Sequence, residues 1–288
     1  MYVTLLSNGS RLHHNTSFFR EPYVFKYLLE YIKERLPKTK YPDGITLNIG
    51  ACSRGDDVWS LVMTLESDGE FASSSYSINA SDINKGVVNL ARSGILSFLP
   101  RTLEKAREVI PTIDTFFEST PCDGSDETTR QELLTEYQRL LEEGDFKRKV
   151  GEDKSTRYVS VGAEGARLSM LYKVSDQLRR KVHFSAIDFT KEFETEQFSH
   201  PCLVIFRNAL QHFNAKEREN FARALYNSLK TGSSLVIGEG DIVKEVPAKL
   251  IDAGLEPLNP TYNRDYYRIH RRDLTRKKDP TAHIFEKN

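Results

Sequence analysis

The stretch LNIGACSRGDDVWSLVMTL, residues 47–65, decides the fold because it begins as an apolar strand and ends as a helix. Gly50 and Gly55 lie in the bend between the two. They predict a tight turn in which a ligand can lie against the backbone without meeting a side chain. A strand, a glycine turn and a helix in this order predict one unit of a parallel sheet with crossover helices.

The rest of the chain continues the alternation of strands and helices. We therefore predict an α/β fold with a doubly wound, Rossmann-like, mostly parallel sheet covered by helices on both faces. The expected helices are 21–36, 57–67, 84–94 and 215–230, and the expected strands are 45–50, 76–83, 201–208, a strand within 231–241 and a late edge strand at 265–273.

Residues 101–157 are charge-rich and interrupt this alternation. Within them, a capping box at Thr129 and Glu132 and a stop at Gly144 predict an inserted helix. Its expected apolar stripe is Leu133, Leu134, Tyr137, Leu140 and Leu141, between exposed loops at 121–129 and 144–156. We predict an N-terminal helical segment, residues 1–40, and one domain, residues 41–288, that carries this helical lobe.

Composition limits the class of protein. The 288 residues are 39% hydrophobic and 28% charged, which is ordinary globular usage. A net charge of zero gives no global preference for nucleic acid or a membrane surface, and no apolar run is long enough to span a bilayer. The sequence leaves the oligomeric state open.

The cysteines and histidines predict neither disulfides nor a metal site. The three cysteines, Cys52, Cys122 and Cys202, are far apart and form no CxxC motif, so we expect a cytoplasmic protein. His13 and His14 are adjacent but lack a third ligand at a fixed spacing, so we expect no bound metal.

The glycine turn does not match the motifs that bind phosphate. Its G-x4-G spacing lacks the Lys-Ser/Thr of a P-loop, and G-x-G-x-x-G is absent. Asp82 ends the second strand, where a doubly wound fold places the acid that binds ribose hydroxyls. Together they suggest an adenosine ligand without phosphate, a description that S-adenosylmethionine (SAM) meets. The alternative is a plain turn, with Asp82 capping the next helix.

Four ordered blocks extend this interpretation and cover residues 15–25, 47–65, 78–96 and 205–241. They begin NTSFFREPYVF, LNIGACSRGDDVW, INASDINKG and IFRNALQHF. In order, they resemble the signature blocks of CheR-type chemotaxis receptor methyltransferases. That family transfers a methyl group from SAM to glutamate side chains and leaves S-adenosylhomocysteine. The resemblance implies a class I methyltransferase fold.

The resemblance also implies functional residues. Arg20 corresponds to the arginine near the methyl-transfer centre, and Asp56 to the first acid of a Glu-Glu-Pro block that here reads Asp-Asp-Val. Asp188 replaces an asparagine near the adenine, which keeps an acceptor and removes a donor. The implied cofactor-binding set is Thr16, Arg20, Gly50, Asp56, Asp82, Ile83, Asp188, Phe189, Arg207 and Asn208.

The departures from the family concern the acceptor. His212 replaces a tyrosine of the acceptor site, so the candidate catalytic residues are Arg20 and His212. A carboxylate needs no base at neutral pH, whereas a hydroxyl or an amine does. The alternative for His212 is a neutral imidazole packed under the strand.

Only 15 residues precede Thr16, where the family carries a helical domain, and the insertion at 101–157 differs from the family's β-subdomain. The acceptor is therefore a protein or a small molecule of unknown identity, and we expect an oxygen nucleophile, preferably a protein carboxylate. Two alternatives remain: a small-molecule O- or N-methyltransferase that uses His212, and a cofactor-binding regulator without turnover.

Overall fold

The computed structural model of the chain describes residues 2–5, 11–14, 17–35, 45–72, 76–98, 100–118, 127–143, 147–150, 157–160, 170–187 and 200–288. The chain forms two compact units, and each is described by itself. Unit 1 comprises Met1–Lys26, Cys52–Ser73 and Asn84–Ala186, and unit 2 comprises Tyr27–Ala51, Ser74–Ile83 and Ile187–Asn288.

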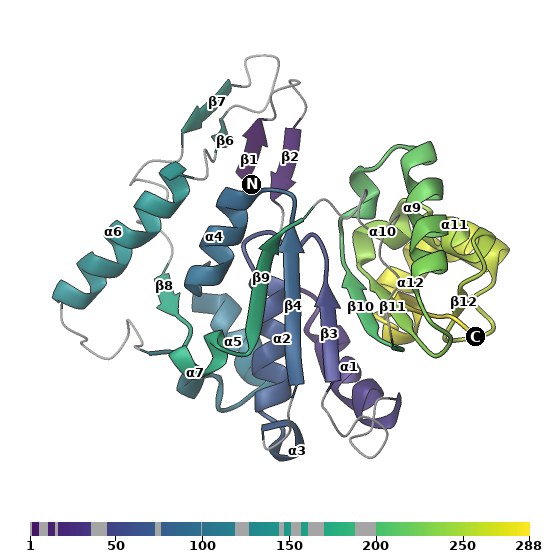
Figure 1. Cartoon of the computed structure of the whole chain (residues 1–288), viewed down its shortest axis with the longest axis horizontal. Helices are drawn as coiled ribbons and strands as arrows, with labels where there is room; N and C mark the ends of the chain where they lie inside the picture. Colours follow the sequence, from purple (N-terminus) through teal and green to yellow (C-terminus); the bar gives the residue numbers. More distant parts are fainter. Residues whose placement is uncertain are drawn as a thin grey trace. The chain divides into compact units, whose positions relative to one another are not determined.

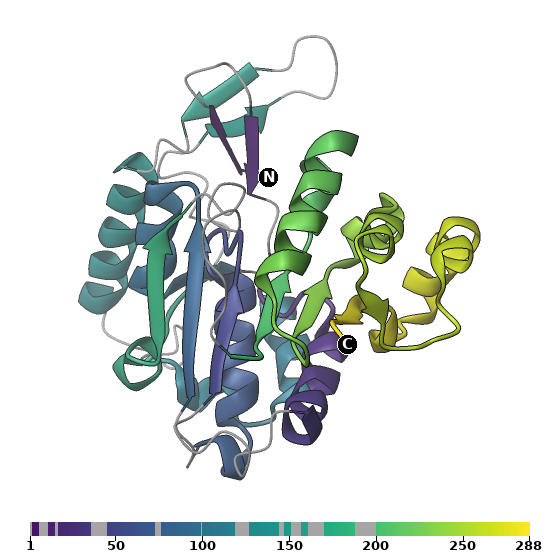
Figure 2. The same ribbon diagram turned by 45° about the vertical axis from the view of Figure 1, so that its right-hand side comes forward.

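Unit 2 contains a mostly parallel sheet, as the sequence predicts. Its strands are β3 (Ile45–Ile49), β4 (Tyr76–Asp82), β10 (Leu203–Phe206), β11 (Ser234–Ile237), β12 (Glu256–Pro257) and β13 (Ile284–Glu286). They are hydrogen-bonded in the order β12-β13-β11-β10-β3-β4, and β3 and β4 lie side by side in Figures 1 and 2. Neighbours from β11 to β4 are parallel, and β13 runs antiparallel to β11 and β12.

The order of the strands creates a switch point beside β3. The next strand along the chain, β4, pairs with one edge of β3, and the much later β10 pairs with the other. Open α/β sheets bind ligands outside the carboxyl ends of the strands at such a point. The topology of unit 2 therefore indicates where a ligand site is expected.

The helices of unit 2 lie between its sheet strands in the chain, except the first, which precedes β3. They are most of α1 (Pro22–Arg35), η3 (Leu210–His212), α9 (Ala215–Ser228), α10 (Glu239–Val243), α11 (Val246–Asp252), α12 (Arg264–Lys277) and η4 (Pro280–His283). In Figure 1, α9 to α12 gather beside β10 and β11. Val204, Phe206, Leu235 and Ile237 of those two strands form the buried core with side chains from these helices, including Phe221.

Unit 1 contains helices and two small antiparallel sheets. The helices are α2 (Asp56–Glu66), α3 (Gly69–Ala72), α4 (Lys85–Ser93), α5 (Pro100–Val109), η1 (Ile113–Phe116), α6 (Glu127–Glu143) and α7 (Asp176–Arg179). The strands are β1 (Tyr2–Leu5), β2 (Arg11–His14), β5 (Ile95–Phe98), β6 (Lys147–Val150), β7 (Arg157–Ser160), β8 (Met170–Lys173) and β9 (Val182–Ala186). Strands pair in the order β2-β1-β6-β7, and β5 pairs with β8.

The predicted helix of the insertion is α6, and its apolar stripe packs as expected. Tyr137, Leu140 and Leu141 are buried in one cluster with Val87 and Leu90 of α4. Leu133 and Leu134 are partly buried against the same cluster. This packing attaches α6 to α4 (Figure 1).

Local signals account for the ends of the helices that flank the sheet strands. The side chain of Asn84 caps α4 by accepting hydrogen bonds from the N–H groups of Gly86 and Val87, and Gly94 ends that helix with φ 70°. Such left-handed ends favour glycine because it lacks a Cβ. Asn214 and Glu217 form a capping box at the start of α9.

Four expectations from the sequence are wrong. The segment 1–40 is not simply helical, because its described residues form strands β1 and β2 before helix α1 begins at Pro22. The segment 265–273 lies in helix α12 and is not an edge strand, because Tyr267 and Leu274 are buried seven residues apart, two helical turns. Helix α6 begins at Glu127, so Thr129 lies inside it and does not cap it. Strand β6 lies within 144–156, where the sequence predicts a loop. Gly144, the expected stop, lies outside the described residues.

In the part of the chain that the structure describes, no helix is both long enough and apolar enough to span a membrane.

Candidate functional site

Two predicted site residues lie at the same level of the sheet in unit 2. Ile49, the last residue of β3, pairs with Ala80 of β4 on one side and with Ile205 of β10 on the other. Asp82 and Arg207 each follow their strand's paired residue by two positions. The register therefore brings Asp82 and Arg207 to the carboxyl edge on either side of β3, and each is only 6% exposed.

The turn after β3 differs in detail from the prediction. The N–H of Gly50 donates a hydrogen bond to the carbonyl oxygen of Ile205, 2.9 Å away, so Gly50 continues the pairing of β3 with β10. Gly50 does not have positive φ; the residues of this turn that do are Ala51 at 51°, Ser53 at 50° and Gly55 at 84°. Left-handed backbone at Ala51 and Ser53 costs about 1 kcal/mol or more each, and such strain gathers at ligand sites.

Asp82 does not cap the helix that follows it in the chain. Asn84 takes that role. The backbone carbonyl of Asp82 accepts a hydrogen bond from the N–H of Ile187 at 2.9 Å. The next side chain, Ile83, is 49% exposed, which places an apolar surface directly beside a buried carboxylate.

Arg207 and Asn208 begin the loop that leaves β10. Asn208 has φ 59°, and its side-chain oxygen accepts a hydrogen bond from the N–H of Gly240 at 2.9 Å. Its backbone N–H donates to Oδ2 of Asp241 at 2.6 Å. The side chain of Asn208 therefore joins two loops of the sheet edge.

Asp241 is a residue that our sequence interpretation misses. It is fully buried in the first turn of α10, and it accepts hydrogen bonds from the loop that carries Asn208. The available signal was the segment IGEGD, residues 237–241, in which two glycines and two acids follow the end of a strand.

His212 ends the short helix η3, close after Asn208 in the chain. Its side chain is exposed. The alternative of an imidazole packed under the strand is therefore wrong, and His212 presents its ring at the surface of unit 2.

In unit 1, Arg20 lies in a strained turn. Both neighbours have left-handed backbone, Phe19 with φ 48° and Glu21 with φ 58°. The Nε of Arg20 is 3.4 Å from a carboxylate oxygen of Glu21, whose side chain is buried. The ring of Phe18 stacks on Phe98 of β5 at 4.8 Å, which fixes the turn against the core of unit 1.

Ser60 links this turn to the start of α2. The N–H of Phe19 donates to Oγ of Ser60 at 2.8 Å, and that hydroxyl donates to the carbonyl oxygen of Asp56 at 2.7 Å. Asp56 is 1% exposed, and Arg54 donates to its carboxylate at 3.2 Å. One hydroxyl thus connects Phe19, the residue before Arg20, to the backbone of Asp56.

The gap beside Asp56 has no room for a water molecule and is lined by Arg54, Asp56, Leu90, Ile95, Leu96, Ser97 and Tyr137. In this gap the carboxylate of Asp56 faces Arg54 and the protein interior. Thr16, Asp188 and Phe189, which complete the predicted set, lie outside the described residues.

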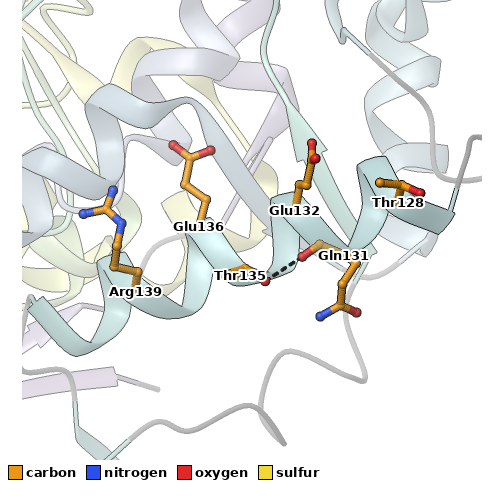
Figure 3. A pocket seen from close by; sticks show the side chains of 6 residues that line it. All are labelled: Thr128, Gln131, Glu132, Thr135, Glu136 and Arg139. Carbon is orange, nitrogen blue, oxygen red and sulfur yellow. Dashed lines mark hydrogen bonds between the residues drawn. The ribbon is translucent and has the colours of Figure 1, made fainter.

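A separate hollow of about 690 Å³ lies along α6. The described residues that line it are Thr128, Gln131, Glu132, Thr135, Glu136 and Arg139. Figure 3 shows Glu132, Glu136 and Arg139 on one side of the helix and Gln131 pointing away from them. None of the predicted site residues that the structure describes lines this hollow.

Comparison with known proteins gives a family and a curated relative. The model of the family described as "CheR methyltransferase, SAM binding domain" matches residues 14–123 and 126–256. Chemotaxis protein methyltransferase 2 of Vibrio cholerae is 21% identical over 232 residues, which cover 80% of this chain and 63% of the relative. The chain thus spans less than two thirds of the length of that relative.

The solved structures that this chain matches include methyltransferases. A putative SAM-dependent methyltransferase of Methanococcus maripaludis is 12% identical, with 96% of this chain and 97% of that chain covered and a TM-score of 0.37. Magnesium protoporphyrin IX methyltransferase of Synechocystis with bound SAM is 12% identical, with 81% and 70% covered and a TM-score of 0.33.

Proposed function

Because the chain belongs to the CheR methyltransferase family and carries its SAM-binding domain, we propose that it transfers a methyl group from SAM to a carboxylate of a protein. The observation that carries the proposal is the register of the sheet. It places Asp82 and Arg207 at the same height on either side of β3, at the switch point. We further propose that residues 41–288 act as one methyltransferase domain with the insertion at 101–157.

The residues of the sheet edge fit an adenosyl group. When bound, SAM supplies an electrophilic methyl group on a sulfonium sulfur. The buried carboxylate of Asp82 suits the two ribose hydroxyls, because a carboxylate accepts and does not donate. The exposed side chain of Ile83 suits a flat apolar ring such as adenine. The remaining proposed cofactor residues are Thr16, Arg20, Gly50, Asp56, Asp188, Phe189, Arg207 and Asn208.

A carboxylate acceptor suits the groups that this chain offers. A glutamate or aspartate side chain is ionised at neutral pH, since its ordinary pKa is about 4, and it needs no general base. Arg20, whose guanidinium is partly exposed, supplies a positive charge that can hold such an anion. The main contribution of the protein is then to align nucleophile and methyl group, which supplies about 7–11 kcal/mol in favourable cases.

We also propose that the protein works in the cytoplasm. Cys52 and Cys202 are buried and form no disulfide in the described part of the chain, which suits a reducing compartment. Burial raises the pKa of Cys202 to about 11, so this thiol stays protonated and unreactive at neutral pH.

The test uses SAM labelled in its methyl group and protein extracts as the source of acceptor. Transfer to a carboxylate gives a methyl ester, and mild alkali releases its label as methanol. Labelled protein that loses its label in alkali supports the proposal. Label that survives alkali contradicts a carboxylate acceptor.

His212 favours a second candidate, a small-molecule O- or N-methyltransferase, because its exposed imidazole could serve as the base that a hydroxyl or an amine needs. The ion pair between Arg54 and Asp56 favours a third, a regulator that binds SAM without turnover. An alkali-stable product identifies the second candidate. Tight binding of SAM without any S-adenosylhomocysteine in many extracts identifies the third.

A further inference from the structure

We propose that Asp241 is the positioning residue of the cofactor edge, because it holds the loop 207–212 in the conformation that this edge requires. The inference rests on the proposed function, since that loop carries the proposed cofactor residues Arg207 and Asn208 as well as His212. Asp241 itself touches neither cofactor nor acceptor in this proposal and acts through the loop.

Asp241 receives three backbone hydrogen bonds. Its Oδ2 accepts from the N–H of Asn208 at 2.6 Å and from the N–H of Gly238 at 3.0 Å. Its Oδ1 accepts from the N–H of Gln211 at 2.9 Å. The donors come from the loop after β10 and from the end of β11, so one fully buried carboxylate joins the carboxyl ends of two neighbouring strands.

The loop is also held by a contact within itself and by one to the segment that holds Asp241. Nε2 of Gln211 donates to the carbonyl oxygen of Asn208 at 2.8 Å, while Oδ1 of Asn208 accepts from the N–H of Gly240 at 2.9 Å. A Cβ at Gly238 would lie 2.3 Å from the amide of Asn208, and a Cβ at Gly240 would lie 2.5 Å from that of Gln211. Both glycines are therefore required for the two amide side chains to fit.

These contacts explain how Asn208 keeps its left-handed backbone. A non-glycine residue at φ 59° is strained and persists only where its surroundings hold it. The carboxylate of Asp241 and the N–H of Gly240 hold Asn208 from both its backbone and its side chain. Loss of the carboxylate would release this residue and, with it, the neighbouring Arg207.

The test compares Asp241→Asn with a matched control, Asp68→Asn. The substitution at 241 turns one acceptor oxygen into a donor amide that faces backbone N–H groups, so at least one of them loses its partner. Asp68 also accepts two backbone N–H bonds, from Glu70 and Phe71, but it lies in the connection from α2 to α3, which is outside the proposed site.

Two readouts are measured well below the melting temperature of each variant. Amide hydrogen exchange, measured without cofactor, reports how firmly the loop 207–212 is held. Calorimetric titration reports the affinity of the site for SAM. In Asp241→Asn we expect exchange at Asn208 and Gln211 to be about tenfold faster, with Val204 of β10 unchanged, and the Kd for SAM to rise about tenfold. Asp68→Asn should change neither.

Unchanged exchange at Asn208 and Gln211 would show that Asp241 does not hold the loop. Faster exchange with a Kd within about twofold of the parent would show a structural role only, and would also overturn the proposal. If the parent protein binds no SAM, the proposed function fails, and the exchange data still decide whether Asp241 holds the loop.

Discussion

Asp82 and Arg207 lie on opposite sides of β3, each two residues beyond a partner of Ile49, and both are buried. An anion and a cation at one level of a sheet edge give a ligand two different polar groups to bind. The bond from the N–H of Gly50 to Ile205 keeps β3 and β10 paired up to this edge. The relationship follows from backbone register, so it does not depend on flexible side-chain positions.

The first prediction concerns Gly55. A Cβ at this residue, where φ is 84°, would lie 3.0 Å from Nε1 of Trp59 and 3.1 Å from Cβ of Ala91. We expect Gly55→Ala to lower the free energy of unfolding by about 1–3 kcal/mol, because strain and crowding add. Gly69→Ala is the control, since its Cβ would meet no atom within 4 Å. Denaturant unfolding of both variants tests this, and equal stabilities would contradict it.

The second prediction concerns Ser60, whose hydroxyl accepts the N–H of Phe19. Ser60→Ala leaves this buried donor without its partner, so we expect a loss of about 1–3 kcal/mol in the free energy of unfolding. The turn that carries Arg20 should also loosen, which raises the KM for the acceptor more than the Kd for SAM.

The control for this variant is Ser67→Ala. In the parent protein, among the contacts described, the hydroxyl of Ser67 donates a hydrogen bond only to the carbonyl oxygen of Thr64. We expect Ser67→Ala to lower the free energy of unfolding by less than about 0.5 kcal/mol. A Ser60→Ala protein with the stability and KM of the parent would show that the hydroxyl does not hold the turn.

The third prediction distinguishes a carboxylate acceptor from a hydroxyl or amine acceptor, which needs a base. If the acceptor is a carboxylate, no base is needed, so His212→Gln should keep kcat within about threefold and the rate should be flat between about pH 6 and 8. If His212 acts as a base, the rate should rise with pH as its imidazole loses a proton, and the variant should lose that rise. The pH profile of kcat for parent and variant decides between them.

Much of the site could be predicted because it follows from strand order. Asp82 ends an apolar strand, and the carboxyl ends of parallel strands meet at one edge, so its position needed no side-chain information. The contacts of Asp241 could not be predicted in this way. Its main partners, Asn208 and Gln211, lie about thirty residues away in sequence and offer backbone N–H groups that any residue has.

The errors have a common cause. The segment DYYRIHRRD alternates apolar and polar residues over nine positions, which suggests a strand. The helical spacing of the buried residues Tyr267 and Leu274 becomes visible only over a longer stretch of sequence. Similarly, glycine at residue 50 suggests the left-handed turn that the chain makes at Ala51 and Ser53. Local composition identifies the bend but not which residue adopts the strained backbone.

The most direct test of the account is a calorimetric titration of the parent protein and of Asp82→Ala with SAM, with Asp68→Asn as the control. We predict that the parent binds SAM, that Asp82→Ala weakens the binding by about 10- to 100-fold through loss of charge-assisted hydrogen bonds, and that the control binds like the parent. Absence of binding by the parent, or equal affinity of the parent and Asp82→Ala, would contradict the account.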